Sequence, residues 1–303
     1  MTLQTVHDSQ NERNTTMNHT INVGGRLMNL SRPQVMGILN VTPDSFYAGS
    51  RKQTDSEIAE RTNQIIEEGA TMIDVGAFST RPGAPEVSEQ EEMARLRHGL
   101  TILRSQQPDA VVSVDTFRPD VARMAVEEYG AAIINDVSEG GITGVVDTPM
   151  ADADLAYEEG KYPPIFRMVA RLRVPYILMS VQPTLKKMLM GFAREVQQLR
   201  DLGVKDIILD PGFGFGKTID ENYALLHHLD KLSVLDLPVL VGVSRKRMIY
   251  NLSCSDADHA LNGTTVVNTI AAMKGASILR VHDVKEAVEV CRITAVTQRC
   301  QSV

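Results

Sequence analysis

Several apolar runs in this chain end in polar side chains that could bind a small molecule and act on it. The clearest run, Asp206-Ile-Ile-Leu-Asp210, leads a carboxylate into the glycine-rich loop Gly212-Phe-Gly-Phe-Gly-Lys-Thr218. Other runs end in Asn40, Asp74, Asp115, Asn135, Lys246, Arg280 and His282. Because an unpaired carboxylate or amide at the end of a buried strand is costly, Asp115, Asn135 and Asp210 need a ligand or a salt bridge. Two carboxylates and an amide match a flat heterocycle with several N–H donors and acceptors.

Basic side chains follow two of the later runs. Residues 244–247, Ser-Arg-Lys-Arg, lead into a helix-like segment, and cations beside a helix N-terminus favour an anion. Arg280 and His282 are two residues apart in a predicted strand, so both side chains leave the same face. We interpret this pair as a site for phosphate or pyrophosphate, with bidentate bonds from Arg280. Asn40 suits Mg2+ that bridges substrate phosphates, because Mg2+ often takes only one or two protein oxygens.

The glycine-rich loop fails two nucleotide-binding patterns. The P-loop spacing requires a glycine where Pro211 stands. The dinucleotide pattern fails because Lys217 occupies the position of its last glycine and no Rossmann strand-helix context accompanies it. We therefore interpret the glycines as allowing Phe213 or Phe215 to flank a ligand ring.

The elements that position these residues alternate along the chain, as in an α/β barrel. The predicted strands are residues 35–39, 71–75, 110–114, 131–134, 176–179, 206–209, 238–243 and 277–281, and amphipathic stretches between them include 55–68, 88–104, 119–129, 187–202 and 266–274. The sequence predicts a single α/β domain, a (β/α)8 TIM barrel. Such a barrel builds its active site at the carboxyl ends of its strands.

Four segments lie outside the regular alternation. Residues 1–20 are rich in Asn, Gln, Thr and His and are expected to form a disordered tail. Residues 21–30 contain Gly24-Gly25 and predict a hairpin that plugs the barrel floor. We place the barrel domain at 21–295 and a C-terminal tail at 296–303. Residues 140–164 lack periodicity, and a lid and a tolerated insertion are equally compatible with them.

Composition excludes some partners and compartments. The net charge of -7 and the pI near 5.6 argue against broad binding to nucleic acid or to an anionic membrane. Three cysteines without CxxC spacing disfavour a disulfide framework or a cysteine-ligated zinc site. The first 20 residues lack the pattern of a signal peptide, and no apolar stretch approaches the roughly 20 residues that span a bilayer. We expect a soluble, cytoplasmic protein.

Seven strings of this sequence occur in the order found in dihydropteroate synthases of the folate pathway, which the chain resembles from about Val35 to Glu289. They are GILNVTPDSF, STRPGA, SVDT, INDVS, DPGFGFGKT, GVSRK and RVHDV. The resemblance implies condensation of 7,8-dihydropterin-6-ylmethyl diphosphate with p-aminobenzoate, which gives 7,8-dihydropteroate and pyrophosphate. It also implies Mg2+, a homodimer and inhibition by sulfonamides, which mimic p-aminobenzoate.

The resemblance assigns roles to residues of this sequence. It implies that the pterin ring binds Asp115, Asn135, Asp210, Phe215 and Lys246. It implies that the diphosphate, with Mg2+, binds Asn40, Arg280 and His282, and that p-aminobenzoate binds Thr80, Arg81, Ser244, Lys246 and Arg247. The implied catalytic residues are Asp115, Asp210, Lys246 and Arg280. Carboxylates can stabilise positive charge on the pterin methylene, while Mg2+ and the cations neutralise the departing oxygens.

The chain departs from the family pattern at two places on the predicted site. Met179-Ser180-Val181 stands where the family usually has Met-His-Met, with Pro183 in place of a common glycine. Arg247 stands where the family often has Ser. Two alternatives stay open: a pterin-binding methyltransferase that serves a corrinoid partner, and a non-catalytic pterin-binding paralogue. Arg280 and His282 disfavour the first because they suit a diphosphate, and the intact polar set disfavours the second.

Overall fold

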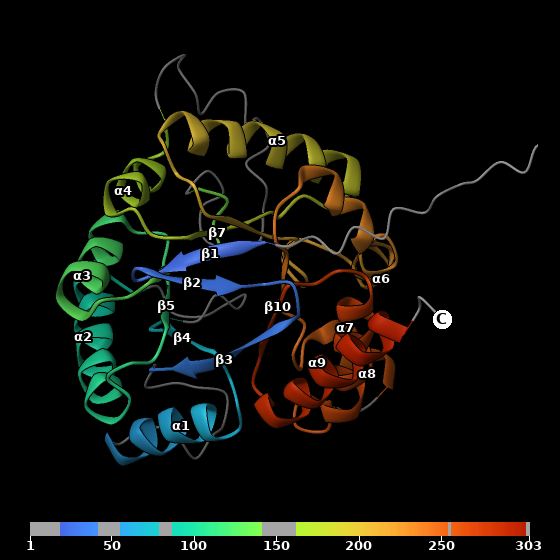
Figure 1. The fold of residues 1–303 in the computed structure, drawn as a ribbon, viewed down its shortest axis with the longest axis horizontal. Coiled ribbons are helices and arrows are strands. Elements are labelled where there is room, and N and C mark those ends of the chain that lie inside the picture. Colours follow the sequence, from blue (N-terminus) through green and yellow to red (C-terminus); the bar gives the residue numbers. More distant parts are fainter. Residues whose placement is uncertain (1–18, 42–54, 79–86, 141–161, 254–255, 301–303) are drawn as a thin grey trace, which may run out of the picture.

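The structure is a computed structural model that describes residues 19–41, 55–78, 87–140, 162–253 and 256–300. Within these residues, eight parallel strands form one sheet: β3 (Gln34–Asn40), β4 (Met72–Gly76), β5 (Val112–Asp115), β6 (Ile133–Asp136), β7 (Tyr176–Met179), β8 (Ile207–Asp210), β9 (Leu240–Val241) and β10 (Ile278–Val281). Their order is β8-β7-β6-β5-β4-β3-β10-β9. A parallel bridge between Leu209 and Val239 joins the two ends of the sheet. The predicted (β/α)8 barrel is confirmed as a nearly closed barrel (Figure 1).

Helices surround the strands (Figure 1). They are α1 (Asp55–Glu67), α2 (Glu89–Gln106), α3 (Pro119–Tyr129), α4 (Pro164–Leu172), α5 (Leu185–Asp201), α6 (Ile219–His227), α7 (Arg247–Ser253), α8 (Leu261–Met273) and α9 (Val284–Arg299), with a 3-10 helix at Leu229–Leu235. Local signals set several helix ends. The Ser88 side chain caps α2 by accepting a hydrogen bond from the Glu91 amide, and Gly130 ends α3 at a φ of 64°, a conformation that suits glycine.

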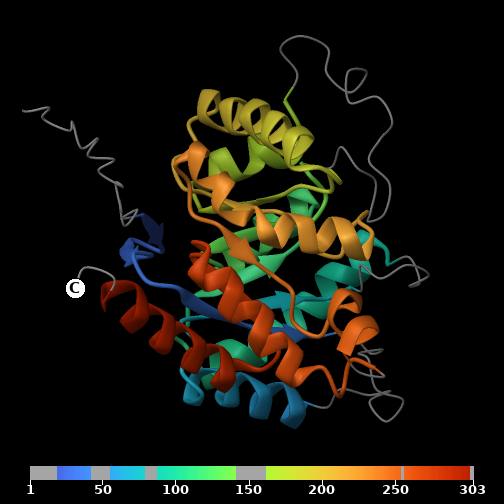
Figure 2. The ribbon, with the colours of Figure 1, turned by 90° about the vertical axis from the view of Figure 1, so that its right-hand side faces the viewer.

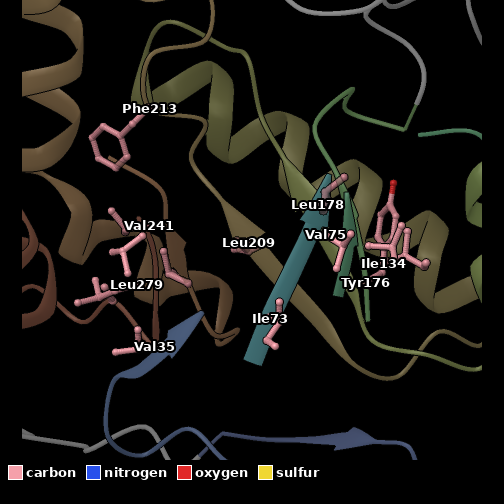
Figure 3. Packing of buried hydrophobic residues seen from close by; sticks show 14 of the residues in the cluster. Val35, Ile73, Val75, Ile134, Tyr176, Leu178, Leu209, Phe213, Val241 and Leu279 are labelled. Carbon is pink, nitrogen blue, oxygen red and sulfur yellow. The ribbon is translucent and has the colours of Figure 1, made fainter. Parts of the chain in front are cut away.

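The period of two along each strand divides its side chains between two environments. Outward side chains such as Ile73, Val75 and Leu279 belong to the main core, which lies between the strands and the helices (Figure 3). Inward side chains at the amino ends of the strands, such as Met72 and Ile278, form a separate apolar layer inside the barrel. Several inward positions at the carboxyl ends are polar instead. The alternation that builds the core therefore also gathers polar residues at one mouth of the barrel.

The N-terminal hairpin closes the opposite end of the barrel. Its strands β1 (Thr20–Val23) and β2 (Arg26–Asn29) pair antiparallel, and Gly24 and Gly25 turn the chain at φ values of 61° and 86°. Its buried side chains join the apolar layer inside the barrel; they are Ile21, Val23 and Leu30. The hairpin lies at one end of the strands in Figure 2 and across the middle of the barrel in Figure 1. The predicted plug is confirmed.

The structure also moves some expected boundaries. Thr20 begins β1, and the rest of the predicted tail before His19 lies outside the described residues. Most of the irregular stretch 140–164 also lies outside them, and α4 begins at its last residue. Helix α9 continues past the expected domain end at 295 to Arg299, where the Gln298 side chain donates a hydrogen bond to the Ala272 carbonyl. No described helix has the length and apolar character needed to cross a membrane.

Candidate active site

The Arg280 side chain links the carboxylates of two other strands across the barrel mouth. Its Nε donates to Asp74 Oδ2 at 2.6 Å, and its Nη2 donates to Asp115 Oδ2 at 3.1 Å. Asn135 Nδ2 donates to the same Asp74 oxygen at 3.0 Å. Strands β4, β5, β6 and β10 thus contribute one connected polar layer. The sequence pointed to Asp74 as a strand end but assigned it no role, and its position at the centre of this layer is a finding of the structure.

This polar layer contains acceptor oxygens that the protein leaves unused. Asp74 Oδ1, Asp115 Oδ1 and Asn135 Oδ1 are buried, and the described part of the chain offers them no hydrogen bond. An unsatisfied buried acceptor costs about 1–3 kcal/mol. Burial raises the pKa of Asp115, while the opposing charge of Arg280 favours its carboxylate form. Three buried acceptors in one connected polar layer favour a ligand that presents several N–H groups to the barrel mouth.

Asp210 and Lys246 form the next part of the mouth. Asp210 Oδ1 accepts a hydrogen bond of 2.8 Å from the Gly212 amide, and burial raises the pKa of this carboxyl against the opposing Lys246 charge. Lys246 Nζ donates to the Phe213 carbonyl at 2.5 Å and lies 4.5 Å from the centre of the Phe215 ring. Burial lowers the pKa of Lys246 to about 8, and the nearby Asp210 opposes this shift. The structure therefore brings together the predicted carboxylate, ammonium and aromatic ring.

The two phenylalanines of the glycine-rich loop have different environments. Phe213 is fully buried in the main core (Figure 3), so the expectation that it could flank a ligand is wrong. Phe215 is only partly buried and packs against Val137, Met179 and Val181. Since Phe215 lies at the mouth, it is the aromatic side chain of this loop that can contact a ring. Sequence spacing did not distinguish the two residues because both follow a glycine.

His282, which the sequence predicts as a ligand of the diphosphate, is held by backbone contacts at the end of β10. Its backbone amide donates to Ser244 Oγ at 3.2 Å, and its carbonyl accepts a bond of 2.6 Å from Arg61 Nη2. Burial and the Arg280 charge lower the pKa of His282 to about 4, so the imidazole is neutral near pH 7. A neutral imidazole can still donate one hydrogen bond to a phosphate oxygen. The predicted pairing of Arg280 and His282 on one face agrees with the outward, buried Val281 between them.

The basic residues of the run 244–247 have different environments. Arg245 forms a two-pronged ion pair with Asp283, with Nη2–Oδ1 at 2.7 Å and Nε–Oδ2 at 2.9 Å. Its Nη1 donates to the carbonyls of Ala257 and Asp258. Arg245 therefore holds the turn in place, whereas Arg247 is exposed at the start of α7. Anion binding by this run stays a prediction, and the Arg245 guanidinium is already paired within the protein.

The structure describes some of the remaining predicted site residues and not others. Asn40 ends β3, and a β-carbon added to the neighbouring Gly76 would lie 3.5 Å from Asn40 Oδ1 and 3.8 Å from Asp115 Oδ2. Asn40 Oδ1 and Asp115 Oδ2 therefore lie on the same side of Gly76, each in van der Waals reach of the position that a β-carbon would take. Thr80 and Arg81 lie outside the described residues. The predicted p-aminobenzoate site is therefore described only at Ser244, Lys246 and Arg247.

Replacing His282 with Gln should flatten the dependence of stability on pH. In the unfolded chain, a histidine has a pKa near 6.5, whereas folding lowers the pKa of His282 to about 4. Between these values the unfolded state binds the extra proton, so wild-type stability falls as pH drops from 6.5 to 4 by at most about 1.4 kcal/mol per pH unit. Urea midpoints at pH 7.5, 6 and 5 measure this effect. Equal slopes for wild type and His282→Gln would contradict the buried neutral state.

The sequence matches a defined family over most of its length. The family described as "Pterin binding enzyme" matches residues 36–282. The dihydropteroate synthase of Escherichia coli K12 is 39% identical over 285 residues, which cover 90% of this chain and 94% of that protein. This chain belongs to the dihydropteroate synthase family. This match confirms the resemblance that the seven strings indicate. Dihydropteroate synthase is a transferase of folate biosynthesis.

Solved dihydropteroate synthases share the fold of this chain. The Yersinia pestis enzyme, solved in complex with a sulfonamide drug, has a TM-score of 0.79 and 35% identity, covering 93% of this chain and all of that one. The Xanthomonas albilineans enzyme, solved with 4-aminobenzoic acid, has the same TM-score and identity, covering 94% of this chain and 99% of that one. These two dihydropteroate synthases therefore agree with the barrel fold of this chain.

Proposed function

We propose that the polar mouth of this barrel binds 7,8-dihydropterin-6-ylmethyl diphosphate and transfers its pterin methylene to the amine of p-aminobenzoate. The observation that carries the proposal is the set of three buried acceptors, Asp74 Oδ1, Asp115 Oδ1 and Asn135 Oδ1, beside the cation of Arg280. The N–H groups of a pterin would satisfy these acceptors. The diphosphate of the same molecule would meet positive charge a short distance away.

The pterin would be held from two sides. Asp115, Asn135 and Asp210 supply acceptors for ring N–H groups, and Lys246 supplies a donor for ring acceptors. Phe215 provides an aromatic ring beside Lys246, whose Nζ lies 4.5 Å from the centre of that ring. As the bond to the diphosphate breaks, positive charge develops on the methylene. Charge that develops in a dry site is stabilised strongly by nearby carboxylates, so Asp115 and Asp210 would lower the barrier.

The leaving diphosphate would bind at the other end of the mouth. Arg280 uses its Nε and part of its Nη2 group on Asp74 and Asp115, which leaves Nη1 to donate to phosphate oxygens. The neutral His282 ring supplies a further donor. Asn40 fits as a protein ligand for Mg2+, because its amide oxygen lies on the same side of Gly76 as the Asp115 carboxylate and a bridging Mg2+ needs few protein oxygens. When bound, Mg2+ would neutralise charge on the departing oxygens.

The attacking amine would approach from the loops at the mouth. The sequence assigns p-aminobenzoate to Thr80, Arg81, Ser244, Lys246 and Arg247, and this assignment stays a prediction. The exposed Arg247 lies at the start of α7, where its guanidinium could pair with the carboxylate of p-aminobenzoate. A related dihydropteroate synthase has been solved with 4-aminobenzoic acid. Sulfonamides, which mimic this substrate, are therefore expected to inhibit the protein.

The direct test is pyrophosphate release by the purified protein given the pterin diphosphate and Mg2+. Release should depend on p-aminobenzoate, yield dihydropteroate, stop when EDTA removes the metal and resume when Mg2+ is added back. Release without p-aminobenzoate would indicate hydrolysis instead of condensation. No release from protein that binds the pterin would indicate a non-catalytic pterin-binding protein. Release unaffected by EDTA would refute the role of Mg2+ at Asn40.

We also propose that the protein acts as a homodimer. Five large apolar side chains are exposed on the adjacent helices α8 and α9: Val266, Ile270, Met273, Ile293 and Val296. Those on α8 follow helical spacing, so they form one stripe. An exposed apolar stripe of this kind suits a second copy of the chain. Sedimentation equilibrium would give the mass of a dimer, and a monomer mass at micromolar concentration would refute the proposal.

A cytoplasmic location stays a prediction.

A further inference from the structure

Lys217 lies where the ends of two strands and the glycine-rich loop meet. Its Nζ donates three hydrogen bonds to backbone carbonyls: to Ser180 at 3.1 Å, to Gly212 at 3.0 Å and to Phe215 at 3.1 Å. An ammonium group has three hydrogens, so all of its donors are used within the protein. Burial lowers the pKa of Lys217 to about 8. Lys217 is therefore committed to the backbone and has no hydrogen left for a substrate phosphate.

Two of the three carbonyls, those of Gly212 and Phe215, belong to the turn that carries Phe215. Gly212 and Phe215 begin and end this turn, and the Phe215 amide donates to the Gly212 carbonyl at 3.1 Å. Gly212 also approaches β7 so closely that a β-carbon there would clash with the Ser180 carbonyl oxygen. On the other side of the loop, Asn222 accepts a bond of 2.7 Å from the Gly214 amide. Lys217 thus joins the two ends of the turn and holds it against the end of β7.

The charge of Lys217 is balanced first by Asp210 at the end of β8 and then by Glu139 beyond β6. Glu139 lies just after β6, is 3% exposed, and is one of the carboxylates that faces Lys217. Its Oε1 accepts a bond of 2.8 Å from Ser180 Oγ. Ser180 therefore bonds to the β6 loop through its hydroxyl and to the β8 loop through its carbonyl. This serine is one of the two residues at which the chain departs from the usual Met-His-Met pattern, the other being Val181.

We propose that Lys217, supported by the Glu139–Ser180 pair, is a positioning residue for the pterin ring. It fixes Phe215 against Val137, Met179 and Val181 before the ligand arrives. The affinity for the ligand is then not reduced by the entropy that a mobile loop loses when it becomes ordered. It acts through the backbone of the turn and does not touch the reacting atoms. This inference rests on the proposed pterin site and adds a residue that the motif itself left without a role.

The test compares full-length Lys217→Met with wild type. The dissociation constant for 6-hydroxymethylpterin, which has no leaving group, and the KM for the pterin diphosphate should both rise by about tenfold, the effect of losing roughly 1.4 kcal/mol of binding. The kcat should fall less than threefold. Lys205→Met is the matched control, because Lys205 is exposed at the opposite end of β8. It should bind and turn over like wild type.

Thermal unfolding of each variant separates positioning from a merely structural role. A lower unfolding midpoint for Lys217→Met, with an unchanged dissociation constant and KM, would overturn the inference. If Lys217→Met does not fold, Ser180→Ala decides: a weaker pterin affinity supports the inference, and an unchanged one refutes it. Wild-type protein that binds pterin without releasing pyrophosphate would refute the proposed reaction alone. Wild-type protein that does not bind pterin would refute both.

Discussion

Replacing Arg280 with Ala should cost both stability and activity. Arg280 neutralises Asp74, which is fully buried, and Asp115. Removing one partner of a buried ion pair costs about 3–5 kcal/mol, because the other charge stays buried. Without this guanidinium the leaving diphosphate also loses a charged donor, so kcat/KM should fall by about 100-fold or more. Urea denaturation and steady-state kinetics with the pterin diphosphate measure the two effects.

A second substitution separates these two roles of Arg280. Adding Asp74→Asn to Arg280→Ala removes one of the uncompensated carboxylates, so part of the lost stability should return. The KM for the pterin diphosphate should stay high, because the donor to the diphosphate is still missing. Recovery of activity together with stability would show that Arg280 acts only as scaffolding. An unchanged KM in Arg280→Ala alone would refute its assignment to the diphosphate.

Strand ends were predictable from sequence because two simple rules apply to them. Polar residues that follow apolar runs must lie at a strand end, which located Asp210 and Asp115 correctly. The period of two placed Arg280 and His282 on one face. The prediction was less accurate at β9: residues 238–243 were predicted as a strand, and only Leu240 and Val241 form one. Pro238 lacks an N–H for the ladder, and its carbonyl instead accepts a hydrogen bond from the Leu209 amide.

Partners distant in sequence could not be predicted in the same way. Arg245 pairs with Asp283, which is 38 residues away, and the run 244–247 contains no sign of that pairing. Lys217 binds carbonyl oxygens, which every residue possesses, so residue type gives no indication of its partners. Helix α4 begins with Pro164 inside a stretch without periodicity. In each case the decisive contact is made by tertiary packing, which no local pattern records.

Replacing Asp210 with Asn should abolish tight pterin binding while leaving the fold intact. The amide can still accept the hydrogen bond from the Gly212 amide that Asp210 Oδ1 accepts at 2.8 Å, so the turn should persist. The negative charge is lost, however, and a hydrogen bond to a charged group contributes about 1.5–3 kcal/mol. Loss of the carboxylate should also lower the pKa of Lys246 further below about 8, because Asp210 contributes the largest of the charges that raise it.

These two effects of Asp210→Asn act together on the ligand. The acceptor for ring N–H groups becomes weaker, and Lys246 becomes a poorer cation at neutral pH, so pterin affinity should fall by about 100-fold, which corresponds to roughly 2.7 kcal/mol. Calorimetry with a pterin measures this directly. Asp220→Asn is the matched control, because Asp220 is exposed in the first turn of α6. Equal affinities for wild type and Asp210→Asn would refute pterin binding at this end of β8. The buried carboxylate there would then have no ligand to explain it.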